Sequence, residues 1–200
     1  ESGAVDNQSG FLASQGDFTF TGGDVDNRLG QFGTDGVLNA HIDNFNNQQG
    51  ALKAGSDMIL DATQLTNDYG GLIQSGGTLH ATAQRISNRD SGDTAGIISL
   101  GDATFAAGTL DNSNGVAYSA KAMSFTGEKL DNTSGLIQSV DDLLIDGAKG
   151  IVDNASGLIL SGKALTLNAI DFINNNTLDD NKGLEAQQIT INTGTLGNER

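Results

Sequence analysis

The sequence of 200 residues contains no proline, no cysteine and no tryptophan. The missing cysteine excludes a disulfide scaffold. The missing proline suits a chain whose backbone N–H groups are nearly all committed to strand pairing. Basic residues are scarce, since 10 Lys and Arg stand against 25 Asp and Glu and leave a net charge of −15. This charge argues against nucleic acid and anionic membranes as partners. No apolar run reaches transmembrane length, so we do not expect the chain to be inserted in a membrane.

What the chain does contain is one unit repeated about every 21 residues, a period typical of solenoids. The unit is clearest in residues 110–129, 130–150 and 152–169, which begin LDNSNG, LDNTSG and VDNASG. Its pattern is an apolar residue, Asp, Asn, two polar residues, Gly, an apolar pair, a small residue and a short alternating segment. The Asn of this pattern recurs along the whole chain, at Asn7, Asn27, Asn47, Asn67, Asn88, Asn112, Asn132, Asn154, Asn175 and Asn198.

The alternating segment near the end of each unit predicts a strand with one buried face. Phe18 with Phe20 and Leu165 with Leu167 are examples. No sustained helical period occurs, and about 21 residues accommodate three short strands and three turns. We therefore predict an all-β fold, a parallel β-helix of about 9 rungs with about 20–24 residues each. Residues 1–200 are expected to form one segment of a longer repeat array. A β-propeller is the alternative, but its blades need roughly twice this period.

Stacked units place the recurring Asn residues in one column along the rod. An Asn amide both donates and accepts hydrogen bonds, so a column of them can form a continuous ladder. An ionised Asp only accepts and could not replace it. Asn also tolerates the left-handed backbone of tight turns, and the Gly three residues later marks the end of the same turn. We predict a structural role for this column.

Two units are longer than the rest, with inserted turns at residues 89–96 and 176–183. Both insertions follow the column Asn, so we expect them on one side of the rod, about 19 Å apart. They are candidate contact loops, although insertions of this length are also tolerated on surfaces without any function. Their acidic residues match no calcium-binding pattern, and we expect no metal or cofactor. The candidate partner-binding residues are Arg89, Asp90, Asp93, Asp179, Asp180, Asn181 and Lys182.

The motif L-D-N-x-x-G-x-I-x-S, as in residues 130–139, resembles the filamentous haemagglutinin repeat. This resemblance implies a right-handed β-helix from a two-partner-secretion exoprotein, exported through an outer-membrane transporter and secreted or displayed on the bacterial cell surface. It further implies a non-enzymatic stalk segment of an adhesin or of a contact-dependent growth-inhibition toxin-delivery protein. Such a segment attaches cells by extension and by contact with a cell-surface receptor, protein or glycan. The chain departs from the family's secretion domain, which usually carries Asn-Pro motifs.

Two alternatives to the stalk stay open. One is a dedicated receptor-binding segment of a contact-dependent growth-inhibition effector. The other is a polysaccharide-active enzyme, because some parallel β-helices are lyases or hydrolases. Catalytic acids should interrupt a repeat, whereas Asp6, Asp26, Asp111, Asp131 and Asp153 obey it. We therefore do not predict an enzyme.

Overall fold

The computed structural model describes residues 3–92, 94–179 and 181–200, and no helix occurs among them. The strands form two parallel sheets, which we call sheet A and sheet B. Sheet A comprises β1 (Val5–Asp6), β3 (Phe18–Gly22), β4 (Val25–Asp26), β6 (Leu38–Asn46), β8 (Met58–Thr66), β10 (Leu79–Ser87), β12 (Ala103–Asp111), β14 (Met123–Asp131), β16 (Leu143–Asp153), β18 (Ala164–Ile173) and β20 (Gln188–Gly197). Sheet B comprises β2 (Phe11–Ser14), β5 (Gln31–Thr34), β7 (Ala51–Ala54), β9 (Leu72–Ser75), β11 (Gly96–Ser99), β13 (Val116–Ser119), β15 (Leu136–Ser139), β17 (Leu158–Ser161) and β19 (Gly183–Glu185).

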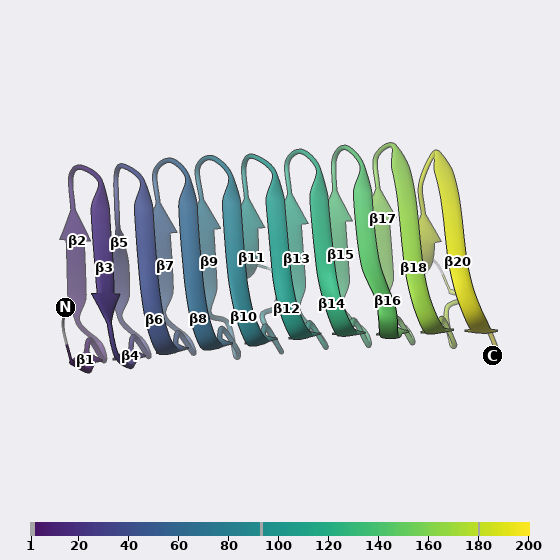
Figure 1. The fold of residues 1–200 in the computed structure, drawn as a ribbon, viewed down its shortest axis with the longest axis horizontal. Coiled ribbons are helices and arrows are strands. Elements are labelled where there is room, and N and C mark those ends of the chain that lie inside the picture. The colour runs from purple at the N-terminus through teal and green to yellow at the C-terminus, as the bar shows by residue number, and fades with distance from the viewer. Residues whose placement is uncertain (1–2, 93, 180) are drawn as a thin grey trace.

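Each strand pairs in parallel with the equivalent strand one coil further along the chain. In Figure 1 the chain rises along sheet B at the back, crosses at the top and descends along sheet A at the front. It advances from left to right while doing so, which makes the coil right-handed, the usual sense for parallel crossovers. The predicted right-handed parallel β-helix of about nine turns is confirmed.

The core lies between the two sheets and runs the length of the rod. In β14, Met123 and Phe125 are buried, and in β15 Ile137 is buried, while their neighbours face outward. Equivalent residues stack in columns, so each coil covers the apolar side chains of the previous one. Burying such side chains stabilises a fold by about 1.5–3 kcal/mol each. The two-residue alternation in the repeat therefore accounts for both sheets.

Two features of sheet A differ from the prediction of three short strands in each rung. Separate strands before and after the bend occur only in the first two coils, as β3 and β4. From β6 onward one continuous strand follows the bend, because its residues keep pairing with the next coil, as Ile42 does with Ala62. In addition, β16 contains a bulge, where pairing shifts between Gly147 and Ile151. The bulge makes room for two extra residues without breaking the sheet.

The backbone of the turn between sheets A and B shows that the repeated Asn and Gly do not have the backbone roles predicted for them. The left-handed residue is not the column Asn but the second residue after it, such as Asn114 (φ 50°) or Ser134 (φ 55°). The Gly is needed for space: a Cβ at Gly135 would overlap the backbone oxygen of Asn112 in the previous coil. The repeat therefore uses Gly to bring successive coils into close contact.

Candidate interaction surfaces of the rod

The Asn column forms a hydrogen-bonded ladder at the edge where sheet A turns into sheet B. Asn112 Nδ2 donates to Asn132 Oδ1 at 2.8 Å, and Asn132 Nδ2 donates to Asn154 Oδ1 at 2.7 Å. The same Asn132 Nδ2 lies 3.1 Å from the backbone oxygen of Leu158. Every bond runs in the same direction, toward the C-terminus. The ladder passes through Asn7, Asn27, Asn47, Asn67, Asn88, Asn112, Asn132, Asn154, Asn174 and Asn198.

The prediction that Asn175 belongs to the ladder is wrong, because Asn174 takes this place. Strand β18 pairs Phe172 with Val152, so Asn174 lies level with Asn154 and accepts its hydrogen bond at 2.9 Å. The prediction started this unit at Ile173, but the larger Phe172 fills the buried apolar position. Asn175 instead accepts a hydrogen bond from the backbone N–H of residue 199 at 2.8 Å.

A second polar column lies inside the rod, where sheet B turns back into sheet A. Its serines are buried, and their hydroxyls bond to backbone carbonyls of the neighbouring turns. Ser119 Oγ, for example, donates to the oxygen of Gly101 at 2.8 Å. The final serine of the repeat motif was the signal for this column, and we read it only as a small residue. Its members are Ser75, Ser99, Ser119, Ser139 and Ser161.

The first inserted turn, residues 89–96, is anchored to the rod by Arg89. Its guanidinium lies 2.8 Å from Oδ2 of Asp68, a fully buried residue in the previous coil. Ser87 Oγ and the backbone N–H of Arg89 both donate to Asp68 Oδ1, at 2.7 and 2.8 Å. The hydrogen bond to Asp68 raises the pKa of Arg89 above its ordinary value. Arg89 is thus occupied by a contact within the rod.

The exposed part of the first turn contains Asp90, and Asp93 lies outside the described residues. Asp90 has a left-handed backbone (φ 53°), and its carboxylate accepts a hydrogen bond from Asn114 Nδ2 at 3.2 Å. Ser91 points back to the rod and accepts the backbone N–H of Val116 at 2.8 Å. Only a short segment of this insertion is therefore presented to solvent.

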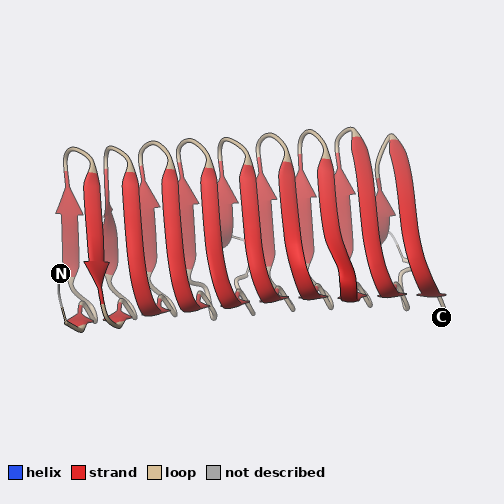
Figure 2. Cartoon of the chain, viewed as in Figure 1, coloured by secondary structure: helices blue, strands red, loops and turns tan. Residues whose placement is uncertain are grey.

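The second inserted turn, residues 176–183, is more exposed. Asp179 is 82% exposed and lies 3.4 Å from Lys182 Nζ, and Asn181 has a left-handed backbone (φ 61°). Asp180 lies outside the described residues. This turn joins β18 to β19, and the first joins β10 to β11, so both leave the same edge of the rod (Figure 2). The two turns therefore lie on one edge of the rod, four coils apart.

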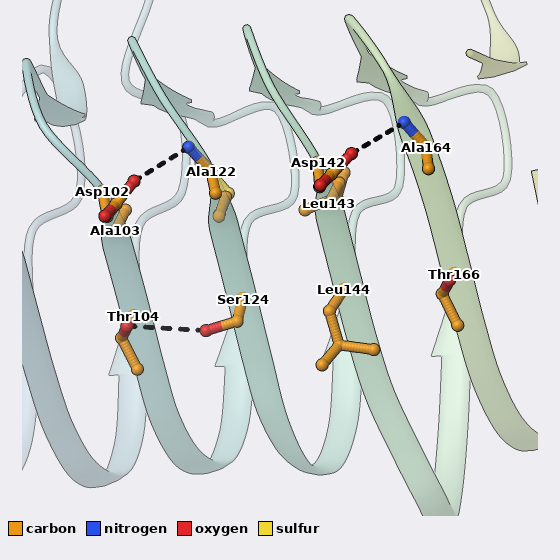
Figure 3. Close-up of a pocket in the computed structure, with 11 residues that line it drawn as sticks. Asp102, Ala103, Thr104, Ala122, Ser124, Asp142, Leu143, Leu144, Ala164 and Thr166 are labelled. Carbon is orange, nitrogen blue, oxygen red and sulfur yellow. Dashed lines mark hydrogen bonds between the residues drawn. The ribbon is translucent and has the colours of Figure 1, made fainter. Parts of the chain in front are cut away.

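The outer face of sheet A has a shallow groove of about 520 Å³ across β12, β14, β16 and β18 (Figure 3). Thr104, Ser124 and Leu144 form its floor. Its two carboxylates bond to the backbone of the following coil: Asp102 accepts from the N–H of Ala122, and Asp142 from that of residue 164, both at 3.1 Å. These acids recur with the repeat and stabilise turns. Among the described residues, no group of three or more His, Asp or Glu side chains is arranged to hold a metal ion.

Short-range ion pairs line the edges of the rod. Arg28 donates to the carboxylate of Asp26 at 2.7 Å, and this interaction lowers the pKa of Asp26 to about 2. Lys163 Nζ lies 2.7 Å from Asp141 Oδ1, and this contact raises the pKa of Lys163. Both pairs are partly exposed, where such pairs contribute about 0–1 kcal/mol. The two pairs lie in different coils and do not converge on one cleft.

The family model of the haemagglutinin repeat matches residues 2–44, 33–113 and 95–199, which together span nearly the whole chain. The chain therefore belongs to the haemagglutinin-repeat family. Comparison with curated proteins and with solved structures gives no match. The family consists of structural, adhesin-like segments of the two-partner-secretion kind, in secreted or surface-exposed proteins. No helix among the described residues is long and apolar enough to cross a membrane.

Proposed function

We propose that this haemagglutinin-repeat chain is an extracellular stalk segment of a bacterial adhesin or toxin-delivery exoprotein. Its function is to extend, so that a distal part of the protein is held away from the exporting cell. The observation that carries this proposal is the uninterrupted Asn ladder, which joins every coil to the next over the whole rod. Eight strand spacings of about 4.8 Å across sheet B make the rod roughly 40 Å long.

The partner during export is the outer-membrane transporter of a two-partner system. A chain without cysteine reaches its folded state without disulfide formation. Each coil also offers the next one a row of backbone groups, an Asn amide and an apolar column to pair with. Such nearest-neighbour stabilisation lets a solenoid grow coil by coil. This supports folding that proceeds as the chain leaves the transporter.

A stalk predicts that coils can be removed without loss of fold. Deleting residues 112–153 joins Asp111 directly to Asn154 and removes two whole coils in register, since Asp111 and Asp153 hold equivalent positions. We expect the maximum dimension from small-angle scattering to fall by about 10 Å, with the β spectrum kept. A deletion of residues 112–142 removes about one and a half coils, out of register, and serves as the control. If both deletions unfold the chain, coils are not interchangeable and the stalk proposal fails.

The second candidate function is receptor contact, and the common edge of the two inserted turns favours it. Of the predicted contact residues, Asp90, Asp179, Asn181 and Lys182 are described and lie on these turns, whereas Arg89 is held by Asp68. Labelled protein should then bind saturably to one cell type in a panel of bacterial and host cells. Replacing residues 90–95 and 176–182 by plain turns of the repeat should abolish this binding. Ser134→Asn, in a plain turn of the same edge, is the matched control.

The outcomes separate the two functions. Saturable binding that the turn replacements remove would support receptor contact through the turns. Binding that survives both replacements would contradict that role. No binding above that of a plain-repeat segment, with the fold intact, would leave the stalk function alone supported. The deletion of residues 112–153 adds a further check, because it brings the two turns two coils closer and should weaken any contact that needs both.

A further inference from the structure

The outer face of sheet B differs in character from the rest of the surface. Alternate residues of each strand, together with the residue that follows it, point outward. In β13, Val116 and Tyr118 are half-buried on the outside, while Ala117 and Ser119 are buried inside. The apolar side chains are most concentrated from β11 to β17, where a strip on neighbouring strands contains Ile98, Leu100, Val116, Tyr118, Leu136, Val140 and Leu158, with Gln138 among them. Leu100 and Val140 are 50% and 47% exposed.

This face is nearly free of charge, although the chain is strongly acidic. Among the described residues at outward positions of sheet B, the charged ones are Asp35, Lys53 and Glu185. They leave the face one net negative charge, whereas the whole chain carries −15. The groove in the outer face of sheet A, by contrast, places the two carboxylates of Asp102 and Asp142 among apolar and hydroxyl-bearing residues. Exposed apolar patches on soluble proteins often mark interaction sites, so this weakly charged strip is a candidate contact surface.

We propose that the outer face of sheet B packs against the same face of a second copy of this chain, so that two rods lie side by side. The inference rests on the proposed stalk function, since paired rods make a stiffer stalk. The nine strands of sheet B stack in nearly straight rows (Figure 1), and faces of this kind pack about 10 Å apart. A second copy supplies an equally long, equally uncharged face.

The size of the face agrees with this occupant. Eight spacings of about 4.8 Å and five residues of about 3.3 Å give a projected area of roughly 650 Å² for each copy. The two copies together would bury roughly 1,300 Å², at the lower end of the roughly 1,200–2,000 Å² that stable protein–protein interfaces bury in total. A glycan is a poorer match, because sugars bind to aromatic platforms and polar groups, and Tyr118 is the one aromatic side chain on the apolar strip between β11 and β17. The remaining charges lie on other surfaces and oppose pairing only at longer range.

The test is sedimentation of the whole chain from about 1 to 200 µM, a range that covers weak to moderate dimers. We expect a monomer–dimer equilibrium that strengthens when NaCl rises from about 0.15 to 0.5 M, because salt screens repulsion between two acidic rods. The double variant Leu100→Glu with Val140→Glu should raise the dissociation constant at least about ten-fold, since two carboxylates on each copy would be buried.

The matched control places the same charges on the outer face of sheet A. Ile59→Glu with Leu144→Glu replaces residues of similar exposure, 37% and 40%, and should change dimerisation less than about two-fold. Circular dichroism must show the same β spectrum for both variants. The inference is overturned if the wild type stays monomeric at about 200 µM in high salt, or if both double variants have equal effects. Association through the rod ends would also overturn it, because that would not respond to the sheet B variant. The coil-deletion experiment tests the stalk separately and does not depend on pairing.

Discussion

Replacing Asn132 by Ala tests whether the ladder stabilises the rod or only accompanies it. The side chain is fully buried in a central coil and takes part in two ladder bonds, accepting from Asn112 and donating to Asn154. After the substitution, Asn112 Nδ2 keeps a backbone partner, the oxygen of Leu136 at 3.0 Å. Among the described contacts, Asn154 Oδ1 loses its donor. The orphaned acceptor costs about 1–3 kcal/mol, and the lost hydrogen bond from Asn112 costs about 0.5–1.5 kcal/mol more.

The expected loss of stability for Asn132→Ala is therefore about 2–4 kcal/mol. Asn132→Asp should be at least as destabilising, because a carboxylate cannot donate and would face the oxygens of Asn154 and Leu158. Ser134→Asn is the control: this exposed residue has φ 55°, a conformation that Asn tolerates. Urea unfolding followed by circular dichroism gives the three midpoints. Equal midpoints for Asn132→Ala and Ser134→Asn would refute the ladder as a source of stability.

Three further predictions concern the turns and edges. Gly157→Ala should destabilise the chain strongly, because its Cβ would overlap a backbone oxygen of the previous coil, whereas Gly16→Ala has open space and should leave the thermal midpoint unchanged. Arg89→Ala should lower the free energy of unfolding by about 2 kcal/mol, because the Asp68 carboxylate stays buried without its cation. Adding Asp68→Asn should recover part of this stability, and no recovery would contradict the pairing. The pKa of Asp26 is lowered from 3.8 to about 2, so its ion pair stabilises the fold above pH 4 and is lost as the pH falls through 2. Asp26→Asn should therefore flatten the acid limb of a stability–pH curve between those values.

The regular part of the fold could be predicted because each coil repeats the same physical requirements. A two-residue alternation fixes which side chains are buried, and the recurring Asn sets the vertical alignment of the coils. Both signals come from local spacing and need no knowledge of distant contacts. The run of three asparagines at residues 174–176 shows the limit of this reasoning. Spacing alone could not choose among them, and the buried Phe172 in the adjacent position decided the alignment.

The candidate site was less predictable, because the role of an inserted residue depends on what lies beside it in the next coil. Arg89 looked like a free contact residue in a polar insertion, but Asp68, about one repeat earlier in the sequence, binds it. The bulge in β16 was hidden for a related reason. Its two extra residues shift the pairing locally between Gly147 and Ile151, and the ladder bond from Asn132 to Asn154 still forms.

Buried columns and exposed turn tips differ in how many coils a substitution affects, and this difference explains how such a rod can acquire binding specificity. A residue in an inward column is bonded to the coils on both sides, as Asn132 is, so a change there disturbs three coils at once. A residue at the tip of a turn, such as Asp179, is 82% exposed and pairs with Lys182 of its own turn. Insertions can therefore accumulate at one edge while the ladder beneath them continues without a break. Recognition on a stalk of this kind is expected at turn tips and on the outer faces of the sheets, because those positions vary without cost to the stacking.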